Sequence, residues 1–393
     1  MVARFYAAGI ALICAAACAS GTAVASSPAP GVAAASSPPA SQMAGPAVTT
    51  TTRAEQVFAS MTDAQRVGQL LMVGCPSTVV SSLCTGAIRT YHVGSVILDG
   101  NSTLSIAQEA SLTAAIQHNA PAHTRLFVST DQEGGLVRRM RGPGFTDYDS
   151  AVVQGGWSPS WLMYSARSWG RQLKSAGINV DLAPVLDTVP PGDTHSPPIG
   201  DLDREYGHYP SAVSTHGLAV ARGLAAAGVA ATVKHFPGLG RVTANTDTTA
   251  HVVDATTTRT DAYLRPFADA VLAKVPFVMM STAIYSRIDA RGPAAFSPVI
   301  VTGILRNTLH FTGVVISDDL GAAKQVSGYP VGDRAWRFVA AGGDMVLTVD
   351  ARQAGVMSSA ILARMRASAG FTQQVYAAVR RVLAAKQARG LLA

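Results

Sequence analysis

The chain has 393 residues, of which 48% are hydrophobic and 14% are charged, a composition typical of a well-buried globular protein and not of a disordered one. The formal net charge of +7 is carried by scattered basic residues that form only short pairs such as Arg138-Arg139. No basic stripe interleaved with aromatic residues indicates nucleic-acid binding, so we interpret the charge as a contribution to solubility that favours an anionic cell-surface polymer over other partners.

Residues 1–18, MVARFYAAGIALICAAAC, have the features of a bacterial export signal. Arg4 precedes a short apolar core, and small residues lead to Cys18. The segment resembles a lipoprotein signal, in which the cysteine is acylated, although Ala15 stands where leucine is usual. An ordinary signal cleaved near ACA or AVA is the alternative. We therefore expect an exported protein, either anchored through Cys18 to the outer face of the cytoplasmic membrane or secreted.

Residues 19–52 consist almost entirely of Ala, Ser, Pro, Gly and Thr, which predicts a disordered linker before a domain at 53–393. Cys75 and Cys84 are the two cysteines that remain after the signal region. In an exported protein such a pair favours a local disulfide, and two reduced buried cysteines are the alternative.

Eight short apolar segments rich in β-branched residues alternate with amphipathic stretches. Their nearly continuous hydrophobicity is typical of strands buried on both faces, as in parallel sheets. We predict strands at 67–74, 93–100, 125–132, 178–187, 229–236, 276–285, 313–320 and 344–350, and a final helix over 372–392. This alternation predicts an α/β fold, a single (β/α)8 TIM-like barrel, with an open doubly wound sheet as the alternative.

Polar residues gather where the predicted strands end. Asp187 follows the fourth strand, and Lys234 and His235 end the fifth, directly before a Pro-Gly-x-Gly turn that predicts a mobile loop beside two hydrogen-bond donors. Asp131 follows the third strand, where a carboxylate can accept two sugar hydroxyls or form a surface ion pair. Barrel active sites are assembled at this face, so a barrel would bring these residues into one cleft.

The seventh strand runs directly into Asp318 and Asp319. Adjacent carboxylates repel each other unless a ligand or cation offsets them. Strand alternation points the two side chains in different directions, so we expect only one to face a cleft easily. A helix N-cap accounts more naturally for Asp319 than for Asp318.

The motifs DQEGG (131–135), KHFPG (234–238), YSRIDARGPAAFS (285–297) and GVVISDDL (313–320), in this order, resemble the β-N-acetylglucosaminidases of glycoside hydrolase family 3. The similarity spans about residues 55–392, and the lipoprotein-like start is similar to exported actinobacterial, including mycobacterial, members. The resemblance implies a TIM-like barrel, with Asp318 as the nucleophile. It assigns sugar binding to Asp131, Arg139, Arg204, Lys234 and His235, where Arg204 matches the family's arginine after an IGD segment once two extra residues are allowed for.

The loop after KHFPG departs from the family's pattern. Members with this activity commonly read KHFPGHG and then, four residues later, Asp-Ser-His, whose histidine is the general acid/base. Here Leu239 replaces the first histidine, and Asn245-Thr246-Asp247 stands in place of Asp-Ser-His. Three interpretations remain: Asp247 is the acid/base, His251 near Asp254 supplies the proton, or the loop is catalytically weakened and the protein mainly binds sugar. We expect Asp247, because a carboxylic acid can do this work when burial raises its pKa.

The resemblance implies a retaining hydrolase that releases terminal β-linked N-acetylglucosamine from peptidoglycan-derived fragments. The alternatives are a β-glucosidase-type exo-glycosidase of the same family and a surface carbohydrate-binding lipoprotein. We expect no cofactor and no metal. The expected partner is a small carbohydrate or muropeptide substrate, with no nucleic acid, membrane contact only through a lipid anchor, and a monomeric chain.

Overall fold

The computed structural model of the protein describes residues 51–193 and 195–393. The expected signal peptide, Cys18 and residues 19–50 of the expected linker lie outside the described residues. The first helix begins at Arg53, and Thr52 caps it by accepting a hydrogen bond from the backbone N–H of Glu55.

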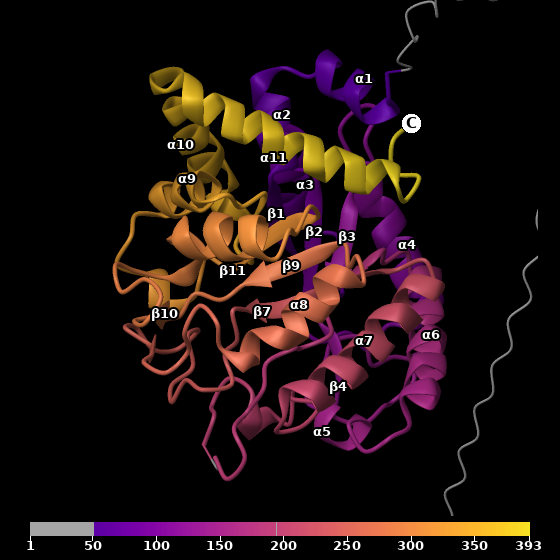
Figure 1. Ribbon diagram of the computed structural model, residues 1–393. Helices are drawn as coiled ribbons and strands as arrows, with labels where there is room; N and C mark the ends of the chain where they lie inside the picture. The colour runs from indigo at the N-terminus through magenta and orange to yellow at the C-terminus, as the bar shows by residue number, and fades with distance from the viewer. Residues whose placement is uncertain (1–50, 194) are drawn as a thin grey trace, which may run out of the picture. The chain divides into compact units, whose positions relative to one another are not determined.

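Eight parallel strands form a closed barrel, in which each pairs with the barrel strands before and after it in the chain (Figure 1). β12 pairs with β1 to close the barrel. This confirms the predicted barrel and excludes the open sheet, in which the first and last strands would not both be paired on two sides. Each predicted strand segment overlaps one barrel strand: β1 (Leu71–Pro76), β2 (Ser95–Asp99), β3 (Phe127–Thr130), β6 (Val180–Asp181), β7 (Ala230–Phe236), β9 (Phe277–Met280), β11 (Val314–Asp319) and β12 (Met345–Thr348).

The barrel interior is a packed core and not a channel. Phe127 on β3 and Phe277 on β9 meet edge to face, with ring centroids 5.3 Å apart, although their strands are not neighbours. All seven residues of β7 are buried, including the polar Lys234 and His235 near its end. The apolar strand segments therefore fill the interior, as expected for strands covered on both faces.

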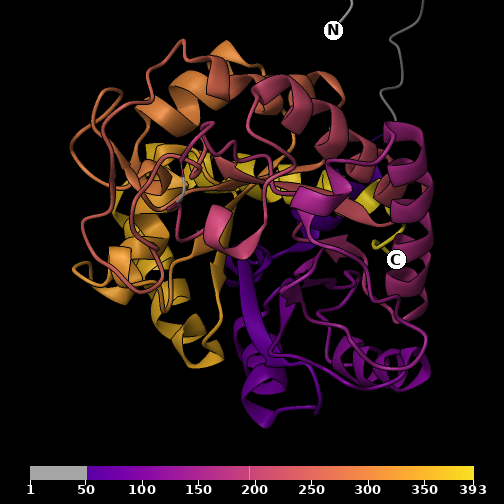
Figure 2. The ribbon, with the colours of Figure 1, turned by 90° about the horizontal axis from the view of Figure 1, so that it is seen from below.

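Helices surround the barrel, as Figures 1 and 2 show. They are α1 (Arg53–Ser60), α2 (Asp63–Gln69), α3 (Ser82–Tyr91), α4 (Ile106–Gln117), α5 (Ala151–Gln154), α6 (Pro159–Ser175), α7 (Pro210–Ala226), α8 (Arg265–Leu272), α9 (Val331–Ala341), α10 (Ala354–Ala367) and α11 (Ala369–Gln387). A π-helical segment, η4 (Val299–Thr308), precedes β11. Among the described residues, none of these helices combines the length and apolar character needed to span a bilayer.

The last helix covers the end of the barrel where the strands begin. Lys386 of α11 is fully buried there and donates to Gly94 O, just before β2, at 2.8 Å. It also donates to Gln69 Oε1, just before β1, at 2.7 Å. The opposite end, which Figure 2 views from below, is built from the loops that follow the strands. This arrangement leaves the second end free for a site.

Three local features shape that free end. A two-stranded antiparallel hairpin of β4 (Gln132–Gly134) and β5 (Val137–Arg138) follows β3. A small parallel pair joins β8 (Val253–Asp254) to β10 (Ile284–Tyr285). A disulfide joins Cys75 at the end of β1 to Cys84 in α3, with the two Cα atoms 5.3 Å apart.

Candidate active site

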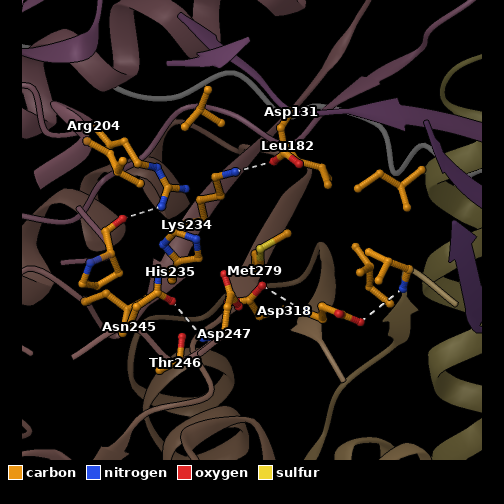
Figure 3. A pocket seen from close by; sticks show the side chains of 18 of the residues that line it. Asp131, Leu182, Arg204, Lys234, His235, Asn245, Thr246, Asp247, Met279 and Asp318 are labelled. Atoms are coloured by element: carbon orange, nitrogen blue, oxygen red, sulfur yellow. Dashed lines mark hydrogen bonds and ion pairs between the residues drawn. The ribbon is translucent and has the colours of Figure 1, made fainter. Parts of the chain in front are cut away.

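A pocket of about 260 Å³ opens where the barrel strands end (Figure 3). Ile97 of β2, Met279 of β9 and Leu347 of β12 contribute apolar lining. The fold brings together here every residue that we expected to act in catalysis or sugar binding: Asp131, Arg139, Arg204, Lys234, His235, Asp247 and Asp318. They come from segments far apart in the sequence, and in a closed barrel the strand ends converge on one mouth.

A chain of alternating charges forms one wall of the pocket. Lys234 places its Nζ 2.7 Å from Asp131 Oδ1 and 2.6 Å from Glu133 Oε1. Glu133 also accepts two hydrogen bonds of 2.8 Å from Nε and Nη2 of Arg204. Asp131 is the more exposed carboxylate, at 21% against 4% for Glu133, so it is the one that offers oxygens to a ligand.

Burial and charge act in opposite directions on this wall. Burial alone would raise the pKa of Glu133, but the charges of Arg204 and Lys234 outweigh it and lower that pKa to about 2. Burial alone would likewise lower the pKa of Lys234, but Asp131 and Glu133 outweigh it and raise that pKa. Glu133 and Lys234 are therefore each held in the charged form by their neighbours.

His235 is oriented by Asp187, which lies beyond the end of β6. The Nδ1 atom of His235 lies 2.7 Å from Asp187 Oδ2, and the other oxygen, Oδ1, accepts from the backbone N–H of His235 at 3.0 Å. The same Oδ1 accepts from Leu239 N at 2.7 Å. A carboxylate beside Nδ1 holds a proton on that nitrogen, which leaves Nε2 as the ring atom free to contact a ligand.

The segment between β7 and β8, residues 237–252, is called here the β7–β8 loop. Two positions at its start require glycine. Gly238 has a φ of 130°, which other residues rarely adopt, and the backbone at Gly240 lies so close to Thr188 that a Cβ would be 2.0 Å from Thr188 O. Farther along, Asn245 Oδ1 accepts from Asp247 N at 2.8 Å, which forms a tight turn (Figure 3). This turn places the exposed Asp247 at the pocket, on the side of Asp318.

Asp318 is buried at the pocket, and its pKa is raised above the usual value for an aspartate. Burial raises its pKa to about 6, and the nearby charge of Asp247 acts in the same direction. His235 and Lys234 oppose this shift without cancelling it. The charge of Asp247 is therefore felt at Asp318 across the pocket.

Asp319 also borders the pocket, which corrects the expectation that only one of the adjacent aspartates would easily face it. The register of β11 shifts between Ile316 and Asp319, so strict alternation does not hold there. The carboxylate of Asp319 is nevertheless committed to backbone N–H groups, those of Gly321 at 2.8 Å, Ala322 at 3.0 Å and Val349 at 3.2 Å. Its role is structural, in keeping with the capping function considered for it.

The structure places His251, the alternative proton donor, away from this pocket. His251 is exposed and lines a different pocket together with Ile284 and Tyr329. Asp254, expected near it, is buried and accepts from Thr256 N at 2.7 Å and Thr257 N at 2.8 Å. This geometry favours Asp247 over His251 as a group that can reach a bound ligand.

Glu133 was not predicted as a site residue, although it lies within the DQEGG motif. Its role depends on Arg204, which comes from the distant η1 region (Gly200–Leu202), and no local pattern shows that pairing. Asp187 was noted only as a carboxylate after a strand. Its contact with His235 requires β6 and β7 to be neighbours in the barrel.

A barrel whose mouth holds facing carboxylates, a Lys-His pair and two arginines is the arrangement of a glycoside hydrolase. Residues 62–385 match the family model described as Glycosyl hydrolase family 3 N terminal domain, and the chain belongs to this family. It is 33% identical over 290 residues to a beta-hexosaminidase of Xanthomonas euvesicatoria, covering 71% of this chain and 83% of the relative.

Solved structures agree with this assignment. The beta-N-acetylhexosaminidase of Beutenbergia cavernae is 46% identical, with a TM-score of 0.81 over 84% of this chain and 99% of that one. The LpqI protein of M tuberculosis is 27% identical, with a TM-score of 0.75 over 86% of this chain and 96% of that one. The chain is thus a glycoside hydrolase of family 3.

Proposed function

We propose that the protein is a retaining exo-β-N-acetylglucosaminidase that releases terminal N-acetylglucosamine from peptidoglycan-derived fragments. The observation that carries the proposal is the placement of Asp318 and Asp247 on one pocket with Asp131, Lys234 and Arg204. The beta-hexosaminidase and beta-N-acetylhexosaminidase relatives support the choice of sugar. The competing β-glucosidase activity is tested by comparing nitrophenyl β-N-acetylglucosaminide with nitrophenyl β-glucoside as substrates.

In the first step, the Asp318 carboxylate attacks the anomeric carbon and the bond from that carbon to the leaving oxygen breaks. Asp247, in its acid form, gives its proton to the leaving oxygen. In the second step, Asp247 as a carboxylate takes a proton from water, the water oxygen bonds to the anomeric carbon, and Asp318 is released. Asp131 would accept the sugar hydroxyls, while Lys234, His235, Arg139 and Arg204 would donate hydrogen bonds.

Trapping tests the nucleophile. A fluorinated N-acetylglucosamine with a good leaving group should form a stable glycosyl-enzyme, and peptide mass spectrometry should find the label on the peptide that contains Asp318. Asp318→Ala should abolish turnover. Tight sugar binding by the wild type without any turnover would instead support the carbohydrate-binding lipoprotein.

Matched variants test the acid. Asp247→Asn should lower kcat/KM by about 10²- to 10⁴-fold for a poor leaving group and much less for an activated aryl one, because the latter needs no proton. His251→Ala should leave kcat/KM nearly unchanged for both leaving groups, since His251 lies outside the pocket. Loss of activity in His251→Ala alone would show that Asp247 is not the acid.

We also propose that the protein is exported and acylated on Cys18. The disulfide between Cys75 and Cys84 supports an oxidising location outside the cytoplasm. Metabolic labelling with a fatty acid, followed by extraction into detergent, should recover labelled protein from the membrane fraction. Cys18→Ala should remove the label and release the protein, whereas an unlabelled wild type would indicate an ordinary secretory signal.

A further inference from the structure

Gln325 joins the β7–β8 loop to the loop that follows the nucleophile's strand. It lies in the helical turn η5 (Lys324–Val326), and only 6% of the residue is exposed. Its side-chain Oε1 accepts from Val252 N at 2.7 Å, and its Nε2 donates to Val252 O at 3.2 Å. Its backbone N–H donates to Thr246 O at 3.0 Å. One residue therefore holds two points of the β7–β8 loop.

A neighbouring bond reaches the expected acid itself. The backbone N–H of Lys324 donates to Asp247 O at 3.0 Å. Between Thr243 and Ala250, the hydrogen bonds to other segments that the described part of the chain provides come from Lys324 and Gln325. The position of the Asp247 backbone is thus set by the residues after β11.

The start of the β7–β8 loop is held separately. Leu239 N donates to Asp187, and Arg241 pairs with Asp261 at 2.7 Å and lies 3.6 Å over the ring of Tyr263. In contrast, a second pocket of about 260 Å³ lies beside the end of the loop, lined by His251 and Tyr329 among others. The hydrogen bonds to the η5 turn therefore contribute to the position of the loop there. They act together with the burial of Val252, which is 4% exposed, and with the bond from Ile284 N to Val252 O at 3.0 Å.

The η5 turn is itself tied to the nucleophile. Asp319 follows Asp318 directly, and its carboxylate accepts from Gly321 N and Ala322 N, which fixes the path of the chain from β11 toward Gln325. The path of the chain after β11 therefore sets where Gln325 stands relative to Asp318. The contacts define a continuous connection from Asp318 through Gln325 to the Asp247 backbone.

We propose that Gln325 is a positioning residue that holds the β7–β8 loop against the η5 turn, and so sets the place of Asp247 relative to Asp318. This inference rests on the proposed role of Asp247 as the acid/base. Its effect reaches the pocket only through the loop that carries Asp247, because Gln325 itself does not line the active-site pocket. A small displacement of a catalytic group costs a large factor in rate, which gives the expected size of the effect.

The kinetic test compares two leaving groups. Gln325→Met keeps the shape of the side chain and removes both bonds to Val252. It should lower kcat/KM by about 10- to 100-fold on the disaccharide N,N′-diacetylchitobiose. On dinitrophenyl β-N-acetylglucosaminide it should lower kcat/KM less than about threefold, because this leaving group needs no proton. Gln325→Glu, which keeps the acceptor for Val252 N, should recover part of the loss.

Gln117 provides a matched control. Its amide makes the same pair of backbone bonds, to Leu126 N and Leu126 O, both at 2.9 Å, but far from the pocket at the other end of the barrel. Gln117→Met should lower the melting temperature without changing the ratio between the two substrates. Equal loss on both substrates in Gln325→Met would show a merely structural role and overturn the proposal.

Hydrogen exchange tests the contact between Gln325 and the loop separately from the chemistry of Asp247. In Gln325→Met the backbone N–H groups of Lys324 and Gln325 should exchange faster, because they are released when the loop opens. Unchanged protection at these two positions would overturn the role of Gln325 in holding the loop, whatever the chemistry of Asp247. If protection falls but Asp247→Asn has no preference between leaving groups, the acid assignment fails, and with it the proposed effect on catalysis.

Discussion

Lys234 and Glu133 form an ion pair of 2.6 Å beneath the pocket, with side chains only 2% and 4% exposed. Both charges have a second partner, since Lys234 also contacts Asp131 and Glu133 also binds Arg204. A buried charge is tolerated only when such partners offset its desolvation. The wall of the sugar pocket is therefore a structural element as well as a binding surface.

Glu133→Gln should destabilise the protein by about 3 kcal/mol, because it leaves Arg204 and Lys234 without a shared anion in a buried place. Urea unfolding at neutral pH measures this. The control is Glu55→Gln, which removes an exposed pair with Arg380 and should cost no more than about 1 kcal/mol. Equal losses in the two variants would show that burial does not strengthen the pair.

The stability that Glu133 contributes should decrease as the pH falls. The pKa of Glu133 is about 2 in the folded state, below the usual 4.5, so its contribution is present above about 4.5 and is lost as the pH falls toward 2. The difference in unfolding free energy between wild type and Glu133→Gln should shrink through that window. A difference that is the same at every pH would contradict a depressed pKa.

The pH profile of kcat/KM should report the ionisation of Asp318. A nucleophile must be charged, so kcat/KM for an activated aryl substrate should rise up to about pH 6 and level off above it. Asp247→Asn removes a charge that raises this pKa, so the rise should move to lower pH. Asp99→Asn, at another exposed carboxylate on the pocket, serves as the control. A rise that stays in place in Asp247→Asn would contradict the effect of the Asp247 charge on the pKa of Asp318.

Asp187→Asn should change the tautomer of His235. The amide can keep its oxygen toward the two backbone N–H groups, but its nitrogen cannot accept the Nδ1 proton. We expect kcat/KM to fall by about 10- to 100-fold and the imidazole nitrogen signals in NMR spectra to shift. Asp254→Asn, at a buried aspartate that also binds backbone N–H groups but lies outside the pocket, should not alter kcat/KM by more than about threefold.

Lys386 should make stability rise with pH. Burial lowers its pKa to about 7, so between about 7 and 10.5 the unfolded chain binds more protons than the folded one, and the free energy of unfolding increases with pH. Lys386→Met should remove this dependence. Relative to the wild type, the free energy of unfolding of the variant should be highest below pH 7 and lowest above pH 10. The variant leaves Gly94 O and Gln69 Oε1 without the donor that Lys386 supplies. If the free energies of unfolding of the wild type and of Lys386→Met changed with pH in the same way, Lys386 would not titrate in this range.

The eight strands and the barrel were predictable because their signal is local. A strand covered on both faces needs a short run of apolar residues, and each such run in the sequence overlaps a strand of the closed barrel. The hairpin of β4 and β5 was not predicted, because its strands have three and two residues and no apolar periodicity. Pairs this short depend on the surrounding chain for their formation.

The kinds of residue at the pocket were also visible in the sequence, since strand ends such as Asp131, Lys234 and Asp318 carry polar groups directly after apolar runs. Which of these groups contact each other could be decided only by the tertiary structure. The bidentate bond of Arg204 to Glu133, the contact of Asp187 with His235 and the position of His251 outside the pocket all join or separate segments distant along the chain. Apolar patterning acts over a few residues, whereas ion pairs and pocket lining depend on how the closed barrel brings its strand ends together.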